Sequence, residues 1–498
     1  MTNVNNIYLI NAGNDDSIVG VANDGTFPAL GILSLATTLR EYLPEVNVQV
    51  DDGQVTSKKN IEKRIRSEKP DVVGVSVLST SYRSSLDYAR VAKEVGATVI
   101  FGNDQPALFG ENMLREREEI DYICTADIGE LSFVEFIEYL RGEKGIGEVR
   151  KLLYRGTTGA FQYNDLPELP TLVELGRNKR NLLDAIPVAD RTLFTAETWR
   201  AYLKNYLSKY GSFHKQGEVT GVTTINRARG CARVKDPCTY CGIANLTLRF
   251  SSPAMFWKEV ESAKDQVNAN IFYEAFDSFS SAPRWIQDLI DSKPKKVEDA
   301  KFFVYTQAYE TNDRLIEKYK RLGVIRVNMG IDSGDDTMLK RLKGPKDSLE
   351  HMKTVLLQYR DNGINVYGSL VLGAPGENYQ SLENSVRFGE WLVDEGIVSA
   401  LEAQPLFPEL NAKAGHWMFN LSEARKAAAE MGFAIQDEEL LGQMPDKWLH
   451  QENPDPDAIS RDWATIFCEV DYDDLLETSR EIRKYAASKN VAEGSAFF

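Results

Sequence analysis

Short apolar runs alternate with longer amphipathic segments along the first 145 residues. The apolar runs are too short for buried helices, so each predicts a strand, at 7–10, 46–50, 71–77, 98–102 and 122–124. Helix-like patterns at 28–42, 82–95 and 129–141 lie between the strands. Strands that alternate with helices predict a parallel, doubly wound sheet. In such sheets ligands bind at the carboxyl ends of the strands.

A second alternating series begins near residue 221. Strand-like runs follow one another with helical segments between them, at 222–225, 271–279, 301–307, 327–334, 363–372 and 401–408. Residues 146–220 contain a hairpin signal around Gly156 to Gly159 and are interpreted as a linker. Residues 411–498 are helical and charged. We therefore expect four parts, at 1–145, 146–220, 221–410 and 411–498.

Composition narrows the choice of partners and compartment. The 498 residues carry a net charge of −16, which disfavours a general nucleic-acid or anionic-membrane surface because either requires a basic face. No run of eighteen apolar residues occurs, and the first residues lack the pattern of a signal peptide. We expect a cytoplasmic protein that binds neither nucleic acid nor membrane.

Three of the five cysteines, Cys231, Cys238 and Cys241, fall within eleven residues directly after a predicted strand. A closed zinc site needs a fourth ligand, but Cys124 and Cys468 are single and distant in sequence. Three local thiolates suit an iron–sulfur cluster that has one iron left free. A structural zinc site and three unrelated buried thiols are the alternatives.

The loop resembles the signature of the radical S-adenosylmethionine (SAM) superfamily, which is C-x3-C-x2-C after the first strand of a partial (β/α) barrel. The lead Arg229-Gly230-Cys231 matches, and Tyr240 supplies the aromatic residue before the third cysteine. The spacing departs from the pattern, because six residues (232–237) separate the first two cysteines. This departure puts the shape of the loop in doubt, but not the ligand set.

Later strands carry further motifs of this family in the expected order. Asp277 lies near the end of the second strand, Gln307 ends the third, Asp332-Ser333 resembles a "Glu-Ser" pair, and Leu372-Gly373 opens a "Gly-x-Pro-Gly-Glu" turn. The resemblance implies that the three cysteines ligate a 4Fe-4S cluster whose free iron chelates S-adenosyl-L-methionine. It also implies SAM contacts from Tyr240, Asp277, Gln307, Asp332, Ser333, Leu372 and Gly373. Because Asp332 is shorter than Glu, its contact with SAM would run through water.

The first 145 residues resemble the cobalamin-binding domain that precedes many radical SAM enzymes. Ser76-Val77-Leu78 matches the family's Ser-x-Leu element, and Gly102-Asn103 stands where the family has Gly-Gly. The resemblance implies a candidate cobalamin site at Ser76, Leu78, Gly102 and Asn103. The Asn103 side chain departs from the pattern, because it would intrude where backbone approaches the ligand. The family's acidic turn appears as Asp127-Ile128-Gly129-Glu130.

The implied fold class is α/β, with an N-terminal Rossmann-like doubly wound domain, a partial (β/α)6 radical SAM barrel and a helical C-terminal region. The implied reaction begins with one-electron cleavage of SAM to a 5′-deoxyadenosyl radical. The expected function is cobalamin-dependent C-methyl transfer in a biosynthetic pathway. The alternative is cobalamin-independent dehydration, epimerisation, oxidation or rearrangement, with the N-terminal domain as a scaffold.

The expected partners are a small-molecule or peptide substrate and a reducing partner such as flavodoxin or ferredoxin. No catalytic residue can be assigned from the sequence. Trp417, Trp448 and Trp463 either line the substrate pocket or belong to the core, and core is the commoner role for such residues.

Overall fold

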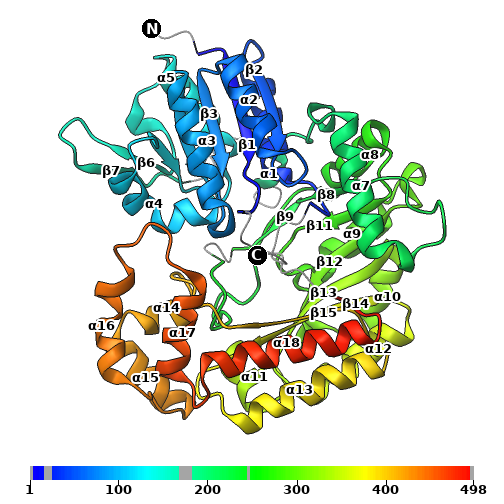
Figure 1. The fold of residues 1–498 in the computed structure, drawn as a ribbon. Coiled ribbons are helices and arrows are strands. Elements are labelled where there is room, and N and C mark those ends of the chain that lie inside the picture. Colours follow the sequence, from blue (N-terminus) through cyan, green and yellow to red (C-terminus); the bar gives the residue numbers. More distant parts are fainter. Residues whose placement is uncertain (1–3, 16–24, 168–181, 244–246, 494–498) are drawn as a thin grey trace.

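The computed structural model describes residues 4–15, 25–167, 182–243 and 247–493. Figure 1 shows an N-terminal α/β part, a second α/β part and a group of C-terminal helices arranged around a common centre. Within the described ranges no helix is long and apolar enough to cross a membrane.

The N-terminal sheet has the strand order β2-β1-β3-β4-β5-β6-β7, and its first five strands are parallel. This order places the switch point between β1 and β3, where doubly wound sheets bind ligands. The strands are β1 Asn6–Asn11, β2 Asn47–Asp52, β3 Val72–Ser76, β4 Thr98–Gly102, β5 Tyr122–Cys124, β6 Leu152–Arg155 and β7 Phe161–Asn164. The predicted doubly wound sheet is confirmed.

The helices of this part are α1 Leu30–Tyr42, α2 Lys58–Glu68, α3 Tyr82–Glu94, α4 Asp104–Glu116 and α5 Gly129–Leu140. The sequence did not predict α2 or α4. Helix α2 buries only Ile61 and Ile65, one turn apart, so its apolar pattern is too sparse to recognise. Helix α4 contains Pro106 in its first turn and Gly110 in its middle, and both weaken a helix signal.

The predicted hairpin forms, and its strands belong to the N-terminal sheet. Strand β6 pairs antiparallel with both β5 and β7. Further along the chain, within 182–195, the buried Arg191 contacts Thr223 and Thr224 on the first strand of the next sheet. Arg191 and Arg227 share the carboxylate of Glu259, and all three side chains are almost fully buried. Helix α7 (Ala196–Tyr210) then packs on β8 (Val222–Ile225), the first strand of the next sheet.

The second sheet is entirely parallel, in the order β16-β15-β14-β13-β12-β11-β8. Its strands are β8 Val222–Ile225, β11 Ile271–Glu274, β12 Lys301–Thr306, β13 Val324–Asp332, β14 Asn365–Leu372, β15 Val398–Pro405 and β16 Ala492–Glu493. The first six are the predicted strands. In the described part of the chain β8 and β16 each pair on one side only, so the barrel is partial and its two edges are open.

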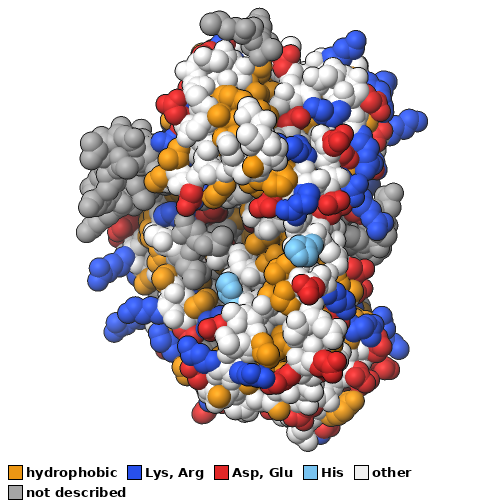
Figure 2. Space-filling model, turned by 90° about the vertical axis from the view of Figure 1, so that its left-hand side faces the viewer, with side chains coloured by type: hydrophobic (Ala, Val, Ile, Leu, Met, Phe, Trp, Pro, Cys, Tyr) orange, Lys and Arg blue, Asp and Glu red, His pale blue; other side chains and the backbone are white. Residues whose placement is uncertain are grey.

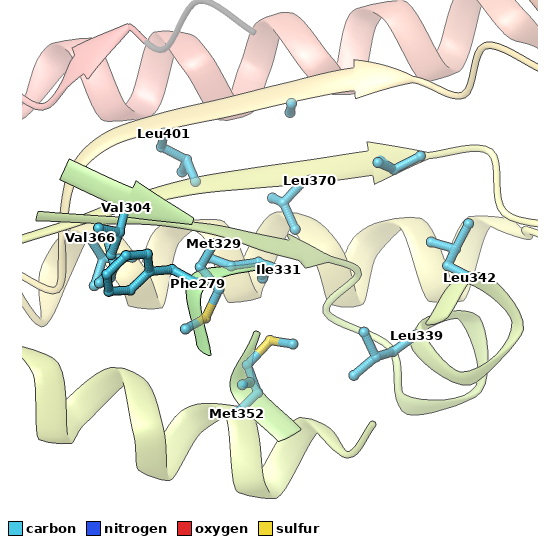
Figure 3. Packing of buried hydrophobic residues seen from close by; sticks show 14 of the residues in the cluster. Phe279, Val304, Met329, Ile331, Leu339, Leu342, Met352, Val366, Leu370 and Leu401 are labelled. Atoms are coloured by element: carbon cyan, nitrogen blue, oxygen red, sulfur yellow. The ribbon is translucent and has the colours of Figure 1, made fainter. Parts of the chain in front are cut away.

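The helices that follow these strands are α8 Pro253–Val267, α9 Pro283–Asp291, α10 Asp313–Leu322, α11 Asp336–Lys343, α12 Leu349–Asp361 and α13 Tyr379–Asp394. Their apolar faces and the sheet form one core. In Figure 3 Met329 and Ile331 of β13 point toward Met352 of α12 and Leu339 of α11. This core fixes the positions of the strand ends, which carry the predicted site residues.

The C-terminal region is helical, as predicted. Its helices are α14 Lys413–Met418, α15 Leu421–Met431, α16 Glu438–Trp448, α17 Pro456–Phe467 and α18 Tyr472–Ser488. Helix α18 runs alongside α13 and covers β15 (Figure 1). Trp417, Trp448 and Trp463 are buried in the hydrophobic core, so the commoner of their two predicted roles holds.

The C-terminal helices also contact the N-terminal part, near α4 in Figure 1. Glu452, in the loop after α16, accepts hydrogen bonds from Arg117 Nε at 2.9 and 3.0 Å and from the Tyr82 hydroxyl at 2.8 Å. Asn112 Nδ2 donates to the carbonyl oxygens of Leu449 and Gln451. The three parts therefore form a closed ring around the carboxyl ends of both sheets. Hydrophobic and charged side chains are interspersed over the face drawn in Figure 2.

Candidate iron–sulfur and cofactor site

The three clustered cysteines lie on one loop that leaves the carboxyl end of β8. Strands β9 (Ala228–Arg229) and β10 (Arg249–Phe250) pair antiparallel and close its base. Thr239 fixes the middle of the loop, because its N–H donates to the Leu342 carbonyl oxygen at 2.7 Å and its own carbonyl oxygen accepts from Ala414 N at 2.8 Å. The loop is therefore held by α11 on one side and α14 on the other.

Three thiols on one loop match the ligand set of a 4Fe-4S cluster that has one iron left free. Cys231, Cys238 and Cys241 are all free thiols. Among the described residues no three His, Cys, Asp or Glu side chains approach closely enough to hold one metal ion. A 4Fe-4S cluster binds each thiolate to a different iron. Burial raises the pKa of Cys238 to about 11 and that of Cys241 to about 12, so ligation would release their protons.

Asp332, at the end of β13, is held by protein groups on both oxygens. The Tyr240 hydroxyl donates to Oδ1 at 2.9 Å, and Lys343 Nζ lies 2.7 Å from Oδ2. Asp332 has a φ of +62°, a left-handed conformation that is uncommon for residues other than glycine. Sequence reasoning missed Lys343, a buried lysine whose only signal was its place in the basic helix after the motif. The Asp332 side chain thus joins the cysteine loop to α11.

Ser333, Leu372 and Gly373 are engaged by the protein itself. The Ser333 hydroxyl accepts from Asp335 N at 3.1 Å, at the start of α11. The Leu372 carbonyl oxygen accepts from Leu406 N at 2.7 Å. The Gly373 carbonyl oxygen accepts from Trp463 Nε1 at 2.9 Å, and φ at Gly373 is +92°. Their predicted roles toward SAM stay predictions.

Asp277 contacts the residue before the first cysteine, and Gln307 contacts the first cysteine itself. Asp277 Oδ2 accepts from the N–H of Gly230 at 3.0 Å, and burial raises the pKa of Asp277 to about 6. The buried Gln307 places Nε2 3.3 Å from Cys231 Sγ. The predicted strand-end residues therefore converge on the cysteine loop, as the carboxyl ends of neighbouring parallel strands should.

The candidate cobalamin residues come together at the carboxyl ends of β3 and β4, where Ser76 pairs with Gly102. Asn103 Nδ2 donates to Ser76 Oγ at 3.0 Å, and Asn103 Oδ1 accepts from the first N–H of α4 at 2.9 Å. The Asn103 backbone has φ +84° and ψ −171°, a region used almost only by glycine. The turn keeps a glycine-type backbone, and the Asn103 side chain folds back onto the protein. Leu78 is half-buried just beyond β3.

The acidic turn of the N-terminal part, residues 127–130, contacts strands β9 and β10 at the base of the cysteine loop. Arg229 NH1 donates to the Asp127 carbonyl oxygen at 2.6 Å, and NH2 donates to Glu130 Oε1 at 3.1 Å. Arg249, on the paired strand, donates to Asp127 Oδ2 at 2.7 Å. The Ser34 hydroxyl donates to the same Glu130 oxygen at 2.7 Å. The acidic turn of the N-terminal part is thus tied to the cysteine loop two residues before Cys231.

A third segment, after β15, contacts both the cysteine loop and the N-terminal part, and it was not singled out from the sequence. Asn411 Nδ2 donates to the carbonyl oxygen of Gly242, next to Cys241, and Leu410 packs on the N-terminal core. Burial, together with the nearby Asp104, raises the pKa of Glu409 to about 7. Proline and acidic residues gave this segment the appearance of an ordinary loop.

Comparison with known proteins gives two family matches. Residues 17–135 match the B12 binding domain, and residues 225–389 match the radical SAM superfamily. The chain is 22% identical over 384 residues to "Uncharacterized methyltransferase PH0819" of Pyrococcus horikoshii, covering 74% of each protein. It is 23% identical over 406 residues to cytidylyl-2-hydroxyethylphosphonate methyltransferase of Streptomyces wedmorensis, covering 73% of each.

The fold is similar to that of the cobalamin-dependent SAM radical enzyme OxsB, with a TM-score of 0.62 and 17% identity. The match covers 88% of this chain and spans 63% of the OxsB chain. The predicted family, fold class and cofactor classes are confirmed by these matches. The chain therefore carries a B12 binding domain, at residues 17–135, in front of a radical SAM domain, at residues 225–389.

Proposed function

We propose that this protein is a cobalamin-dependent radical SAM methyltransferase that acts on a small molecule or a short peptide in a biosynthetic pathway. One observation carries the proposal most strongly. Arg229 binds the acidic turn of the B12-binding domain and lies two residues before Cys231. A ligand on the β3–β4 edge and a ligand on the cysteine loop would therefore face one shared space, as methyl transfer between two cofactors and a substrate requires.

The residues divide into three proposed groups. Cys231, Cys238 and Cys241 would hold the cluster. The SAM group comprises Tyr240, Asp277, Gln307, Asp332, Ser333, Leu372 and Gly373. Ser76, Leu78, Gly102 and Asn103 would meet cobalamin. When bound, the cluster and cobalamin supply one-electron cleavage of SAM and carriage of a methyl group. The protein's own part is to bind, orient and exclude water.

The two curated relatives support methyl transfer, since both are named methyltransferases. The Arg117–Glu452 contact, which ties the C-terminal helices to the B12-binding domain, supports an arrangement in which the three parts surround the cofactors. A reducing partner such as flavodoxin or ferredoxin is proposed to supply the electron for the cleavage of SAM.

The test uses the full chain, purified without oxygen and reconstituted with iron, sulfide and hydroxocobalamin, then desalted. We expect about four irons per chain, a retained corrinoid absorption band, and 5′-deoxyadenosine with S-adenosylhomocysteine when SAM and a reductant are added. Cys238→Ala should lose iron but keep the corrinoid. Cys468→Ala, which changes a buried cysteine outside the loop, should keep both.

Two outcomes would overturn the proposal. Zinc in place of iron would remove the radical chemistry. A loaded cluster without any retained corrinoid would leave 5′-deoxyadenosine formation intact and would favour the alternative, in which the B12-binding domain is a scaffold.

A further inference from the structure

The six residues between Cys231 and Cys238 form an ordered element. Asp236 N donates to the Arg233 carbonyl oxygen at 3.2 Å, which closes a turn. Lys413 Nζ, from α14, lies 2.8 Å from Asp236 Oδ1. On the other side the Asp236 carboxylate packs against Gly344, where a side chain would collide with it. The longer spacing thus has a defined shape that turns Arg233 inward.

Arg233 is buried, and each nitrogen of its guanidinium group donates a hydrogen bond. Its NH2 donates to Asp347 Oδ2 at 2.6 Å, and NH1 donates to the Lys343 carbonyl oxygen. The guanidinium lies 4.5 Å from the centre of the Tyr309 ring. Its Nε donates to Gln307 Oε1. A planar guanidinium with this many partners cannot rotate away without breaking several contacts.

These contacts decide which way the Gln307 amide points. Arginine has no acceptor atom, so the amide oxygen must face Arg233 and the amide nitrogen must face the opposite side. There Nε2 donates to Ser278 Oγ at 2.7 Å and to Cys231 Sγ at 3.3 Å. A reversed amide would set a nitrogen against the guanidinium and an oxygen against the sulfur. Arg233 therefore makes Gln307 a hydrogen-bond donor to Cys231.

We propose that Arg233 and Gln307 are positioning residues that raise the reduction potential of the cluster held by Cys231. This inference rests on the proposed cluster. Reduction adds negative charge to a cluster and its thiolates. A hydrogen bond to a ligating sulfur and a buried cation both stabilise that charge, and both are known determinants of cluster potentials. The extended spacer would supply this pair of groups, since Arg233 belongs to it.

The experiment is an EPR-monitored redox titration of the reconstituted full-length protein without SAM. Gln307→Met removes the donor, and Arg233→Met removes both the charge and the group that orients the amide. We expect a more negative midpoint potential in each variant. In the double variant the shift should be smaller than the sum of the two single shifts, because both act through one hydrogen bond.

Two conservative variants separate tuning from a merely structural role. Gln307→Glu keeps the shape but places an acceptor at the sulfur, so its midpoint should also fall. Arg233→Lys keeps the charge but loses the planar fork, so its midpoint should lie between those of wild type and Arg233→Met. Arg387→Met, which removes an exposed arginine paired within α13, should leave the midpoint unchanged.

The outcomes are distinguishable. If the wild type binds no 4Fe-4S cluster, the proposed function fails. If it binds the cluster and the Gln307 and Arg233 variants titrate at the wild-type midpoint, this inference fails and the proposed function stands. The EPR signal comes only from assembled clusters, so a variant that binds less iron still reports its own midpoint potential.

Discussion

Glu377→Gln tests how the turn after β14 is held. Glu377 is fully buried, and its Oε2 accepts from the N–H groups of Gly373 and Ala374, both at 3.2 Å. The Ser381 hydroxyl donates to the other carboxyl oxygen. A glutamine has the same shape and can keep these contacts, with its oxygen toward the backbone and its nitrogen toward Ser381. The substitution therefore removes the ionisable group and little else.

The size of the effect follows from the pKa of this carboxyl group. Burial, opposed by the hydrogen bonds from Ser381 and the backbone, raises the pKa of Glu377 from 4.5 to about 7. One pKa unit corresponds to about 1.4 kcal/mol, so ionising Glu377 costs about 3.4 kcal/mol more in the folded than in the unfolded chain. Because the folded-state pKa is the higher one, the stabilisation is fully present below about pH 4.5 and is lost as pH rises through about 7.

The assay is urea unfolding of wild type and Glu377→Gln, followed by tryptophan fluorescence, across about pH 5.5 to pH 8.5. The difference between the two proteins cancels the titration of all other groups. We expect the wild type to lose about 1.6 kcal/mol relative to the variant between about pH 5.5 and pH 7, and the difference to level off above about pH 8. Stability curves that run parallel over this range would refute the reasoning.

Three further substitutions test the surrounding architecture. Trp463→Phe keeps an aromatic ring in place but removes the hydrogen bond to the Gly373 carbonyl oxygen, so we expect a loss of about 1 kcal/mol in urea unfolding and weaker SAM binding by calorimetry. Glu452→Ala removes the charge-assisted contact with Arg117 and should cost about 1.5–3 kcal/mol, whereas the exposed Glu383→Ala should change stability by less than about 0.5 kcal/mol. Asn103→Gly relieves backbone strain of about 1–3 kcal/mol, and the desalted protein should retain at least as much corrinoid as wild type; a loss of corrinoid would contradict the glycine-type interpretation of this turn.

The strands were predictable because each is a compact apolar run with clear boundaries. Strands β4, β5 and β8 begin and end at the predicted residues. Helices whose stability depends on tertiary contacts were not predictable. Helix α2 has a mainly charged sequence and is held by the burial of Ile61 and Ile65 against its neighbours. A local pattern does not contain that information.

For the site, the sequence predicted which strand ends carry function, but not how their side chains pair. The cysteine motif and the motif at Asp332 are far apart in the chain, and only the fold brings Tyr240 onto Asp332. Lys343 and Arg233 were missed because a buried cation has the same sequence signature as an exposed one. The burial of Arg233 depends on partners such as Asp347, which is more than a hundred residues away in the chain.

Two departures from the family pattern share one physical explanation. Asn103 stands in place of a glycine and Asp332 in place of a glutamate, and both adopt a positive φ at the carboxyl end of a strand. Lys69 and Asn268 also have positive φ, but they end helices, where that conformation is common. At Asn103 and Asp332 the side chain is instead tied to a neighbouring element, Ser76 in one case and Tyr240 with Lys343 in the other. Strained backbone persists only where its surroundings over-determine it. At these two strand ends the backbone is therefore pre-organised by contacts within the protein.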